Sequence, residues 1–411
     1  MEPIAEAAAP AFPFKRTCPF DPPPQYAAAR AAGPVCPVTL WNGKRAWLVT
    51  RHAEIRAVLS DDARFSGAMA HPDFPTVTAA RVVVDQNERA FVGMDNPAHD
   101  AYRRLFTREF SVRRMQALKP QIAAIAERLI DELERQGPPA DLVATLAVKF
   151  PSLVMSALFG SPYEDHEFII ACAVARHGLT QSGEEAGTKA RELAAYVRRL
   201  IDAKESALLA NAETAPGDDM VSRIIAEHVK TGRLSRDDFA EIGAMILRAG
   251  HDTTTNMVGM GTLLLLQNQE KRSKLAANPA LIEGAVEELL RFVSPVQFSP
   301  RRVALEDVEI GGVTIPKGEG LFMLLASANR DERRFEQPDL LDPARDASEH
   351  LTFGFGIHQC LGQMLARYEL QIVFETILRR LPNLRLAVPL DQIRFKHDMQ
   401  IYGVHNLPVS W

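Results

Sequence analysis

The sequence has few cysteines, and none of them is paired by spacing. Four cysteines stand in 411 residues, and no two form a C-x-x-C motif. We therefore expect neither a structural zinc site nor a disulfide framework. Such sparse cysteines are typical of a protein from a reducing compartment. The four are Cys18, Cys36, Cys172 and Cys360.

The sequence also lacks a basic excess and a long N-terminal apolar run. It has 47 Lys and Arg against 52 Asp and Glu, a formal net charge of -5, and no basic run stands out. We therefore expect no nucleic acid partner. The N-terminal stretch MEPIAEAAAPAFPFKR has early acidic residues and internal prolines, which is typical of neither a signal peptide nor a membrane anchor. We expect a cytoplasmic protein without a membrane attachment.

The spacing of apolar residues predicts a mainly helical fold. From about residue 100 to residue 270 they recur at three- and four-residue intervals. Two β-favouring runs flank Asn42-Gly43, which is a strong hairpin signal, and residues 307–320 predict a second hairpin. Residues 1–35 are rich in proline and alanine, and we expect an extended lead-in there. We predict one domain over all 411 residues, mainly α with small β-sheets (α+β).

One loop, FGFGIHQCLG (Phe353–Gly362), places a cysteine among three glycines. The ordinary explanation of Cys360 is a small buried hydrophobe, as most free cysteines are. The context favours another, because glycines let backbone N–H groups turn towards the sulfur and the following helix directs its N-terminal dipole at it. Both effects favour a thiolate, which is either a nucleophile with His358 as a nearby base or a metal ligand. A single thiolate without another local ligand suits a metal held by a macrocycle, and haem is the usual case.

A long apolar helix is predicted over residues 239–267, with polar residues at its centre. Gly250, Asp252 and three threonines are poor mid-helix residues. Threonine hydroxyls can bond back to carbonyls one turn earlier and bend a helix. One explanation is a kinked core helix in which Asp252 needs a partner, because an unpaired buried carboxylate is costly. The other is a widened helix that makes room for O2 and a proton path.

The cysteine loop resembles the haem-binding loop of the cytochrome P-450 superfamily, through the spacing F-x-x-G-x-H-x-C-x-G from Phe353 to Gly362. The resemblance implies that Cys360 is the axial iron ligand and that His358 binds a haem propionate. Phe353, Gly354 and Gly362 are expected to contact the haem as parts of this loop. The haem would then lie between the long distal helix and the proximal helix that follows the loop.

The distal segment, residues 249–254, resembles the same family's distal-helix signature. The resemblance implies that Ala249 lies beside the haem. It also implies that Asp252 and Thr253 form an acid–alcohol pair, which relays protons to iron-bound oxygen.

Further residues match the family in their spacing. His99 and Arg103 are four apart, and the resemblance assigns them, with Arg302, to the haem propionates; a solvated polar face is the alternative explanation of the first two. Glu288 and Arg291 are three apart and would meet as an ion pair on one helix. With Arg345 they are expected to form a structural triad behind the haem pocket, with no part in the chemistry.

Arg248 departs from the family, which usually has an aliphatic residue at this position. We consider three alternatives for its guanidinium: it enters the distal pocket and binds a carboxylate or another acceptor of the substrate, it pairs with Asp252, or it turns away to solvent or another acid. Other substrate-contact candidates rest on position alone, and each is equally well explained as ordinary core. They are Val92, Met245, Ala249, Phe298, Gln400 and Ile401.

The resemblance implies a soluble bacterial haem-thiolate monooxygenase that uses haem b and inserts one atom of O2 into a small molecule by hydroxylation or epoxidation. The substrate is expected to be a secondary metabolite or a foreign compound, and an acidic group on it would suit Arg248. The alternatives are a peroxygenase or a nitric-oxide-reducing enzyme, and a haem sensor without catalysis.

The same resemblance implies external electron partners, because 411 residues leave no room for an attached redox domain. We expect a monomer that receives electrons from a ferredoxin and its NAD(P)H-dependent reductase, which dock on the side of Cys360. Basic docking candidates, each also explained as a solvated surface arginine, are Arg104, Arg108, Arg113, Arg114 and Arg367.

Overall fold

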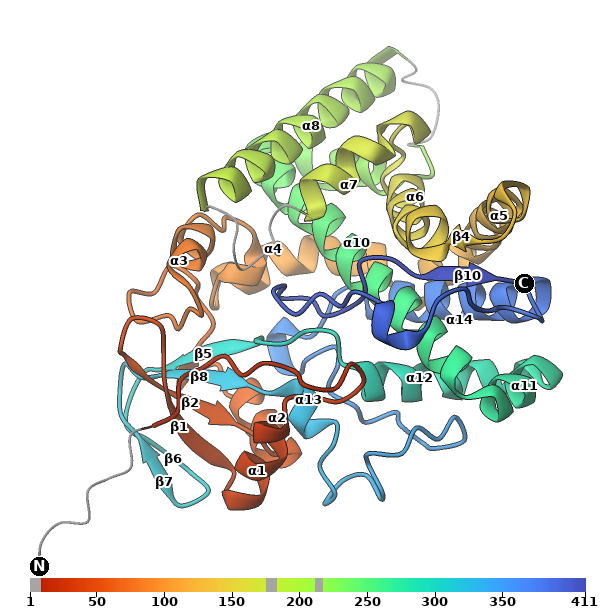
Figure 1. The fold of residues 1–411 in the computed structure, drawn as a ribbon. Coiled ribbons are helices and arrows are strands. Elements are labelled where there is room, and N and C mark those ends of the chain that lie inside the picture. The colour runs from red at the N-terminus through yellow and green to blue at the C-terminus, as the bar shows by residue number, and fades with distance from the viewer. Residues whose placement is uncertain (1–8, 175–182, 211–216) are drawn as a thin grey trace, which may run out of the picture.

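The computed structural model describes residues 9–174, 183–210 and 217–411. The five-stranded sheet, the two-stranded sheet and the helices near them lie on one side of the molecule, and the long helices and the small three-stranded sheet lie on the other side (Figure 1). This arrangement agrees with the predicted mainly helical fold with small sheets. The helices are α1 Pro24–Ala32, α2 His52–Ser60, α3 Ala79–Gln86, α4 Ala98–Thr107, α5 Val112–Gln136, α6 Lys149–Phe159, α7 His166–Val174, α8 Gly183–Ala210, α9 Met220–Ile224, α10 Arg236–Gln267, α11 Gln269–Ala277, α12 Ile282–Val293, α13 Leu325–Ala328 and α14 Gln363–Arg380.

The described strands form three small sheets. A five-stranded sheet has the order β1-β2-β8-β5-β3, a three-stranded one the order β4-β10-β9, and β6 and β7 pair alone. Both predicted hairpins are confirmed: β1 pairs antiparallel with β2 around Gly43, whose φ is 77°, and β6 pairs with β7 around two glycines of positive φ. The strands are β1 Val35–Thr39, β2 Arg45–Val49, β3 Phe65–Ser66, β4 Ala140–Asp141, β5 Arg301–Ala304, β6 Val308–Ile310, β7 Val313–Ile315, β8 Gly320–Met323, β9 Arg385–Leu386 and β10 Pro408–Ser410.

The expected extended lead-in is wrong for residues 24–32, which form helix α1. Proline at the first helical position has a suitable φ and lacks only an N–H that would have no partner there, and the alanines that follow have high helix propensity. The helix is anchored by the buried Arg30, whose guanidinium lies 3.1 Å from Glu332 and donates to Ser327. Tertiary contacts thus support a helix in a stretch whose prolines suggest none.

Helix α10 is the longest described helix and crosses the helical part (Figure 1). Its N-terminus is capped by Ser235, whose hydroxyl accepts the N–H of Asp238. The helix runs without interruption from Arg236 to Gln267, through the polar centre that the sequence predicts as bent or widened. Gly250 has a packing reason, because a Cβ there would collide with the Met155 side chain of α6.

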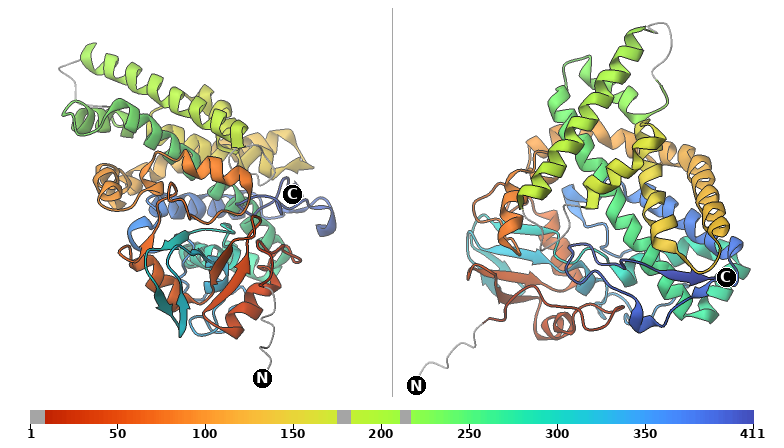
Figure 2. Two further views of the ribbon diagram at one scale, coloured as in Figure 1. Left: turned by 90° about the vertical axis from the view of Figure 1, so that its left-hand side faces the viewer. Right: turned by 45° about the horizontal axis from the view of Figure 1, so that its top comes forward.

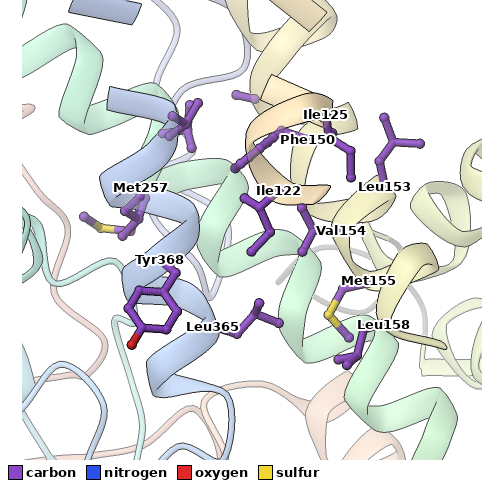
Figure 3. Close-up of a cluster of buried hydrophobic side chains, with 14 of the residues drawn as sticks. Ile122, Ile125, Phe150, Leu153, Val154, Met155, Leu158, Met257, Leu365 and Tyr368 are labelled. Carbon is purple, nitrogen blue, oxygen red and sulfur yellow. The ribbon is translucent and has the colours of Figure 1, made fainter. Parts of the chain in front are cut away.

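The hydrophobic core holds α10 and α14 at a fixed separation. Figure 3 shows side chains of α5, α6, α10 and α14 gathered in one apolar cluster, and α8 covers α10 at the end of the molecule away from the five-stranded sheet (Figure 2). Burial of each such side chain contributes roughly 1.5–3 kcal/mol. The labelled residues are Ile122, Ile125, Phe150, Leu153, Val154, Met155, Leu158, Met257, Leu365 and Tyr368. This core therefore positions the two helices whose residues line the cavity described next.

Candidate active site

A cavity lies between α10 and α14, with the cysteine loop along one side. Ala249 and Thr253 line it from α10, and Leu365 and Glu369 line it from α14. Most other lining residues are apolar, and Arg103 and Glu369 are the charged ones among those that the structure describes. The cavity is therefore suited to a largely apolar group with a polar edge.

The cysteine loop is held in one shape by its backbone. The N–H of Cys360 donates to the carbonyl oxygen of Phe353 at 2.9 Å. Gly354 and Gly356 have φ values of 70° and 72°, and a Cβ on Gly356 would also collide with the carbonyl oxygen of Leu59. Two features therefore require glycine at position 356: the backbone is left-handed there, and it lies very close to α2.

The Cys360 sulfur lies in the interior but is open to the cavity. The N–H of Gly362 donates to it, and Arg103 and Arg367 add positive charge nearby, all of which lower the pKa of the thiol. Burial outweighs them and raises the pKa above its ordinary value. The loop's N–H donor thus favours the thiolate, as expected, while burial opposes it. A metal cation at the sulfur would supply the missing charge, because a coordinated thiol loses its proton.

Basic side chains gather at one edge of the cavity. The rings of His99 and His358 lie 4.4 Å apart, and each ring has a buried Nε2 without a hydrogen-bond partner in the described chain. Arg103 donates to the carbonyl oxygen of Gln359 at 2.5 Å. The buried Arg302 donates to the carbonyl oxygen of Arg301 at 2.8 Å, and the side chains of His358 and Arg302 both border Gly67.

Burial is the main cause of the perturbed pKa values in this basic cluster. It lowers the pKa of His358 to about 3, helped by the positive charge of Arg302, and it lowers the pKa of Arg302 to about 10. Buried donors without acceptors are costly, so a group with carboxylates at its edge would be stabilised here. Haem has two propionates, and the four basic residues assigned to them by resemblance fit this group.

The polar centre of α10 presents only part of its predicted pair to the cavity. Thr253 lines the cavity, and its Oγ1 donates to the carbonyl oxygen of Ala249 at 3.1 Å, which is the back-bonding predicted for these threonines. Asp252 is 1% exposed and is not among the lining residues. Its Oδ1 accepts from Asn256 at 3.0 Å and lies 4.0 Å from Lys396 Nζ, so the required partner exists and is not Arg248.

Comparison with known proteins decides the family. The family model described as Cytochrome P450 matches residues 174–397. Cytochrome P450-SU2 of Streptomyces griseolus is 45% identical over 394 residues, 96% of this chain and 94% of that protein. A 20-oxo-5-O-mycaminosyltylactone 23-monooxygenase of Streptomyces fradiae is 40% identical over 402 residues, 98% of this chain and 92% of that protein. The crystal structure of GfsF has a TM-score of 0.90 at 42% identity and covers 98% of this chain and 100% of that one.

The chain belongs to the cytochrome P450 family. It is a haem-thiolate monooxygenase. Enzymes of this class bind haem through a cysteine thiolate and use O2 as a co-substrate. None of its described helices is long and apolar enough to cross a membrane.

The predicted triad contacts are present in this P450. Arg291 donates to Glu288 through Nε at 2.7 Å and through Nη2 at 2.8 Å, and both side chains are fully buried. Arg345 donates to the same carboxylate at 3.3 Å. Arg291 also donates to the carbonyl oxygens of Asn329 and Pro338. The triad thus ties α12 to the segment before the cysteine loop.

Arg248 turns away from the cavity. Its Nη2 lies 3.1 Å from Glu88 Oε2, both side chains are buried, and it is not among the lining residues. Of the three alternatives, the structure has the one in which the guanidinium meets another acid. The cause is the loop after α3, which brings Glu88 to α10 although the two partners are 160 residues apart.

The remaining substrate-contact candidates divide into two groups. Val92 and Met245 line the cavity. Phe298 does not, because its ring packs edge-on against Phe12 in the core beside the five-stranded sheet. Gln400 donates to Ser299, and Ile401 is buried and bridges to Val296. Lining positions in this region are instead Pro295, Val296, Ser299 and Pro300.

Glu369 is a cavity residue that the sequence did not single out. It accepts a hydrogen bond from Thr254 at 3.1 Å, and burial raises the pKa of its carboxyl to about 8. A signal was present, because this acid stands in α14 close to Leu365, Leu370 and Val373, where an amphipathic pattern would place an apolar residue.

Four of the five predicted docking arginines have carboxylate partners within the chain. Arg367 is the least exposed of the paired ones, at 18% of its side chain, and binds Glu287 with two hydrogen bonds, so its first role is internal. Arg113 is exposed. The other pairs are Arg104 with Asp100, Arg108 with Glu227, and Arg114 with Glu109.

Proposed function

We propose that this P450 binds haem between α10 and α14 with Cys360 as the axial ligand and oxidises a bulky, apolar and neutral small molecule on the α10 side. The observation that carries the proposal is the cavity itself: the Cys360 sulfur opens into it from one side, Thr253 faces it from the other, and basic side chains stand at its edge. When bound, the haem supplies O2 activation, which a thiolate ligand promotes.

The basic cluster is proposed to hold the haem by its carboxylates. His99, Arg103, Arg302 and His358 would donate to the two propionates, which satisfies the buried nitrogens that have no partner in the described chain. The loop residues Phe353, Gly354 and Gly362 support Cys360, and Ala249 leaves room beside the haem face.

Thr253 and Asp252 are proposed to supply protons on the distal side. The Thr253 hydroxyl lies in the cavity wall and can pass a proton inward, since it both donates and accepts. Asp252 is the adjacent buried acid, reached from the other side of α10. The apolar lining around Thr253 excludes bulk water, so protons are delivered only through such positioned groups.

The substrate is proposed to be neutral, as a secondary metabolite or foreign compound of low polarity. Arg248 was the reason to expect an acidic group, and it is paired with Glu88. Val92 and Met245, with Met155 and Ile246, would then contact the substrate through apolar surface. The Streptomyces fradiae relative is named for a 20-oxo-5-O-mycaminosyltylactone, which supports a large substrate of this general kind.

Electrons are proposed to come from NAD(P)H through a ferredoxin and its reductase, which act on a cytoplasmic monomer made of one catalytic domain. Arg104, Arg108 and Arg113 are exposed and offer basic contacts for an acidic partner. Such contacts act mainly on the association rate and weaken with salt.

A matched ligand screen tests the substrate proposal. The haem Soret band is followed while pairs of compounds, each a neutral ester and its free acid, are added to the holoprotein. We expect shifts from the neutral members. A consistent preference for the acids would contradict the proposed class.

A further inference from the structure

A buried lysine faces the acid of the distal helix from an element that the sequence did not connect with it. Lys396 Nζ lies 4.0 Å from Asp252 Oδ1, and the two side chains are 10% and 1% exposed. A lysine is almost never buried unless it is paired. Among the described residues, Asp252 is the carboxylate whose charge raises the pKa of Lys396 against the lowering caused by burial. The two residues therefore form a buried ion pair.

The C-terminal segment fixes Lys396 in this place. Phe395 bridges to Val404, and the N–H of Lys396 donates to the carbonyl oxygen of Gly403 at 2.9 Å. A Cβ on Gly403 would collide with the side-chain amide of Asn256, one turn beyond Asp252. Only glycine lets residues 395–404 approach α10 this closely, so the pair depends on the backbone and not on a flexible surface contact.

The surroundings leave Asp252 with Lys396 as its cationic neighbour. Asn256 donates to Oδ1, while Asp252 Oδ2 has no hydrogen-bond partner in the described chain. His251, the neighbour on α10, donates from Nε2 to the carbonyl oxygen of Val148, and burial lowers its pKa to about 4, so it is neutral at pH 7. The other titratable groups near Lys396 lie on its own segment and are exposed: Arg394, His397, Asp398 and His405.

We propose that Lys396 is a positioning residue for proton delivery, which keeps the Asp252 carboxylate ionised and turned towards residues 395–404, so that protons reach Thr253 from that side of α10. The proposal rests on the roles proposed above for Asp252 and Thr253. Burial raises the pKa of Asp252 above its ordinary value, and the ammonium charge of Lys396 and the hydrogen bond from Asn256 oppose this rise. An anionic carboxylate can take a proton and pass it on, whereas a permanently protonated one cannot accept the next.

The test compares Lys396→Met, which keeps the stem and removes the charge, with Lys396→Arg, which keeps the charge. Arg394→Met is the matched control, because it removes an exposed positive charge from the same segment. Infrared difference spectra of the holoproteins report the carbonyl stretch of a protonated carboxylic acid. The protonated Glu369 carboxyl gives such a band in every variant, and this band cancels when the wild-type spectrum is subtracted. In Lys396→Met minus wild type we expect a further band at neutral pH. This further band should be lost in the double variant with Asp252→Asn and absent from Arg394→Met minus wild type.

Turnover with O2, ferredoxin and reductase gives the second readout. In Lys396→Met we expect product per electron pair to fall about tenfold, a part of the roughly 10²–10⁴-fold that a positioned proton donor supplies. The affinity for substrate should stay within about twofold, because Lys396 does not line the cavity. Lys396→Arg should recover most of the coupling. An ionised Asp252 together with wild-type coupling in Lys396→Met would overturn the proposal.

A variant that does not fold and a failure of the proposed function can both be told apart from a failure of this inference. If Lys396→Met does not fold, Lys396→Gln gives the same comparison with a polar side chain, and its unchanged coupling would equally overturn the proposal. If wild type lacks the spectrum of thiolate-bound haem, the proposed function fails and not this inference. A normal wild-type spectrum with unaltered coupling in the variants refutes the inference alone.

Discussion

Replacing Arg291 by methionine should destabilise the fold more than loss of a surface ion pair. Arg291 and Glu288 are both fully buried, and the guanidinium also donates to three carbonyl oxygens, at 2.7, 2.8 and 3.3 Å. Removing one partner of a buried ion pair costs about 3–5 kcal/mol because the other charge is left unpaired. Arg345 still donates to Glu288 at 3.3 Å and offsets part of this. We expect a loss of about 4 kcal/mol, a large part of a typical stability of about 5–15 kcal/mol.

Urea unfolding of the holoprotein measures this loss. The double variant Glu288→Gln/Arg291→Met should be more stable than Arg291→Met alone, because it leaves no buried unpaired charge. Arg104→Met is the matched control: its pair with Asp100 is also on one helix but exposed, and its loss should cost less than about 0.5 kcal/mol. The reasoning is refuted if Arg291→Met lies within about 1 kcal/mol of wild type, or if the double variant is the less stable.

Gly356→Ala should release haem on dilution faster than wild type, since its φ of 72° and the carbonyl oxygen of Leu59 both oppose a Cβ; equal retention of the Soret band would contradict this. Glu369→Gln should stabilise the protein relative to wild type above pH about 8 and not below pH about 4.5. The reason is that the Glu369 carboxyl, whose folded pKa is raised to about 8, contributes stability that is lost as the pH rises from about 4.5 to about 8. Parallel curves of stability against pH for the two proteins would refute this. Arg248→Met should lower stability by about 3 kcal/mol, because it removes the cation that lies 3.1 Å from the buried Glu88 carboxylate. It should leave Soret titrations with neutral ligands unchanged, and altered ligand affinity would place Arg248 at the substrate.

The sequence predicted what is specified locally. The Asn42-Gly43 hairpin and the bend around Cys360 are set by residues within a few positions, and the Arg291–Glu288 pair by helical spacing. Helix α1 was missed because its prolines suggested an extended chain, whereas one of them occupies the first helical position.

Long-range partners were not predictable, because they depend on how elements pack. Glu88 meets Arg248 across 160 residues, and Lys396 meets Asp252 from the C-terminal segment. The prediction that Ile401 faces the substrate was wrong for the same reason. The bridge between Val296 and Ile401 decides which of these positions faces the cavity, and the sequence alone does not give the register of this bridge.

The central claim is that the Cys360 sulfur is the axial ligand of a haem in the cavity between α10 and α14. The most direct measurement is the spectrum of the reduced protein under carbon monoxide, for wild type and Cys360→His. We predict the strongly red-shifted Soret band of a thiolate-ligated haem in wild type, and retained haem without that shift in Cys360→His. A red-shifted band that persists in Cys360→His, or its absence from haem-loaded wild type, would contradict the claim.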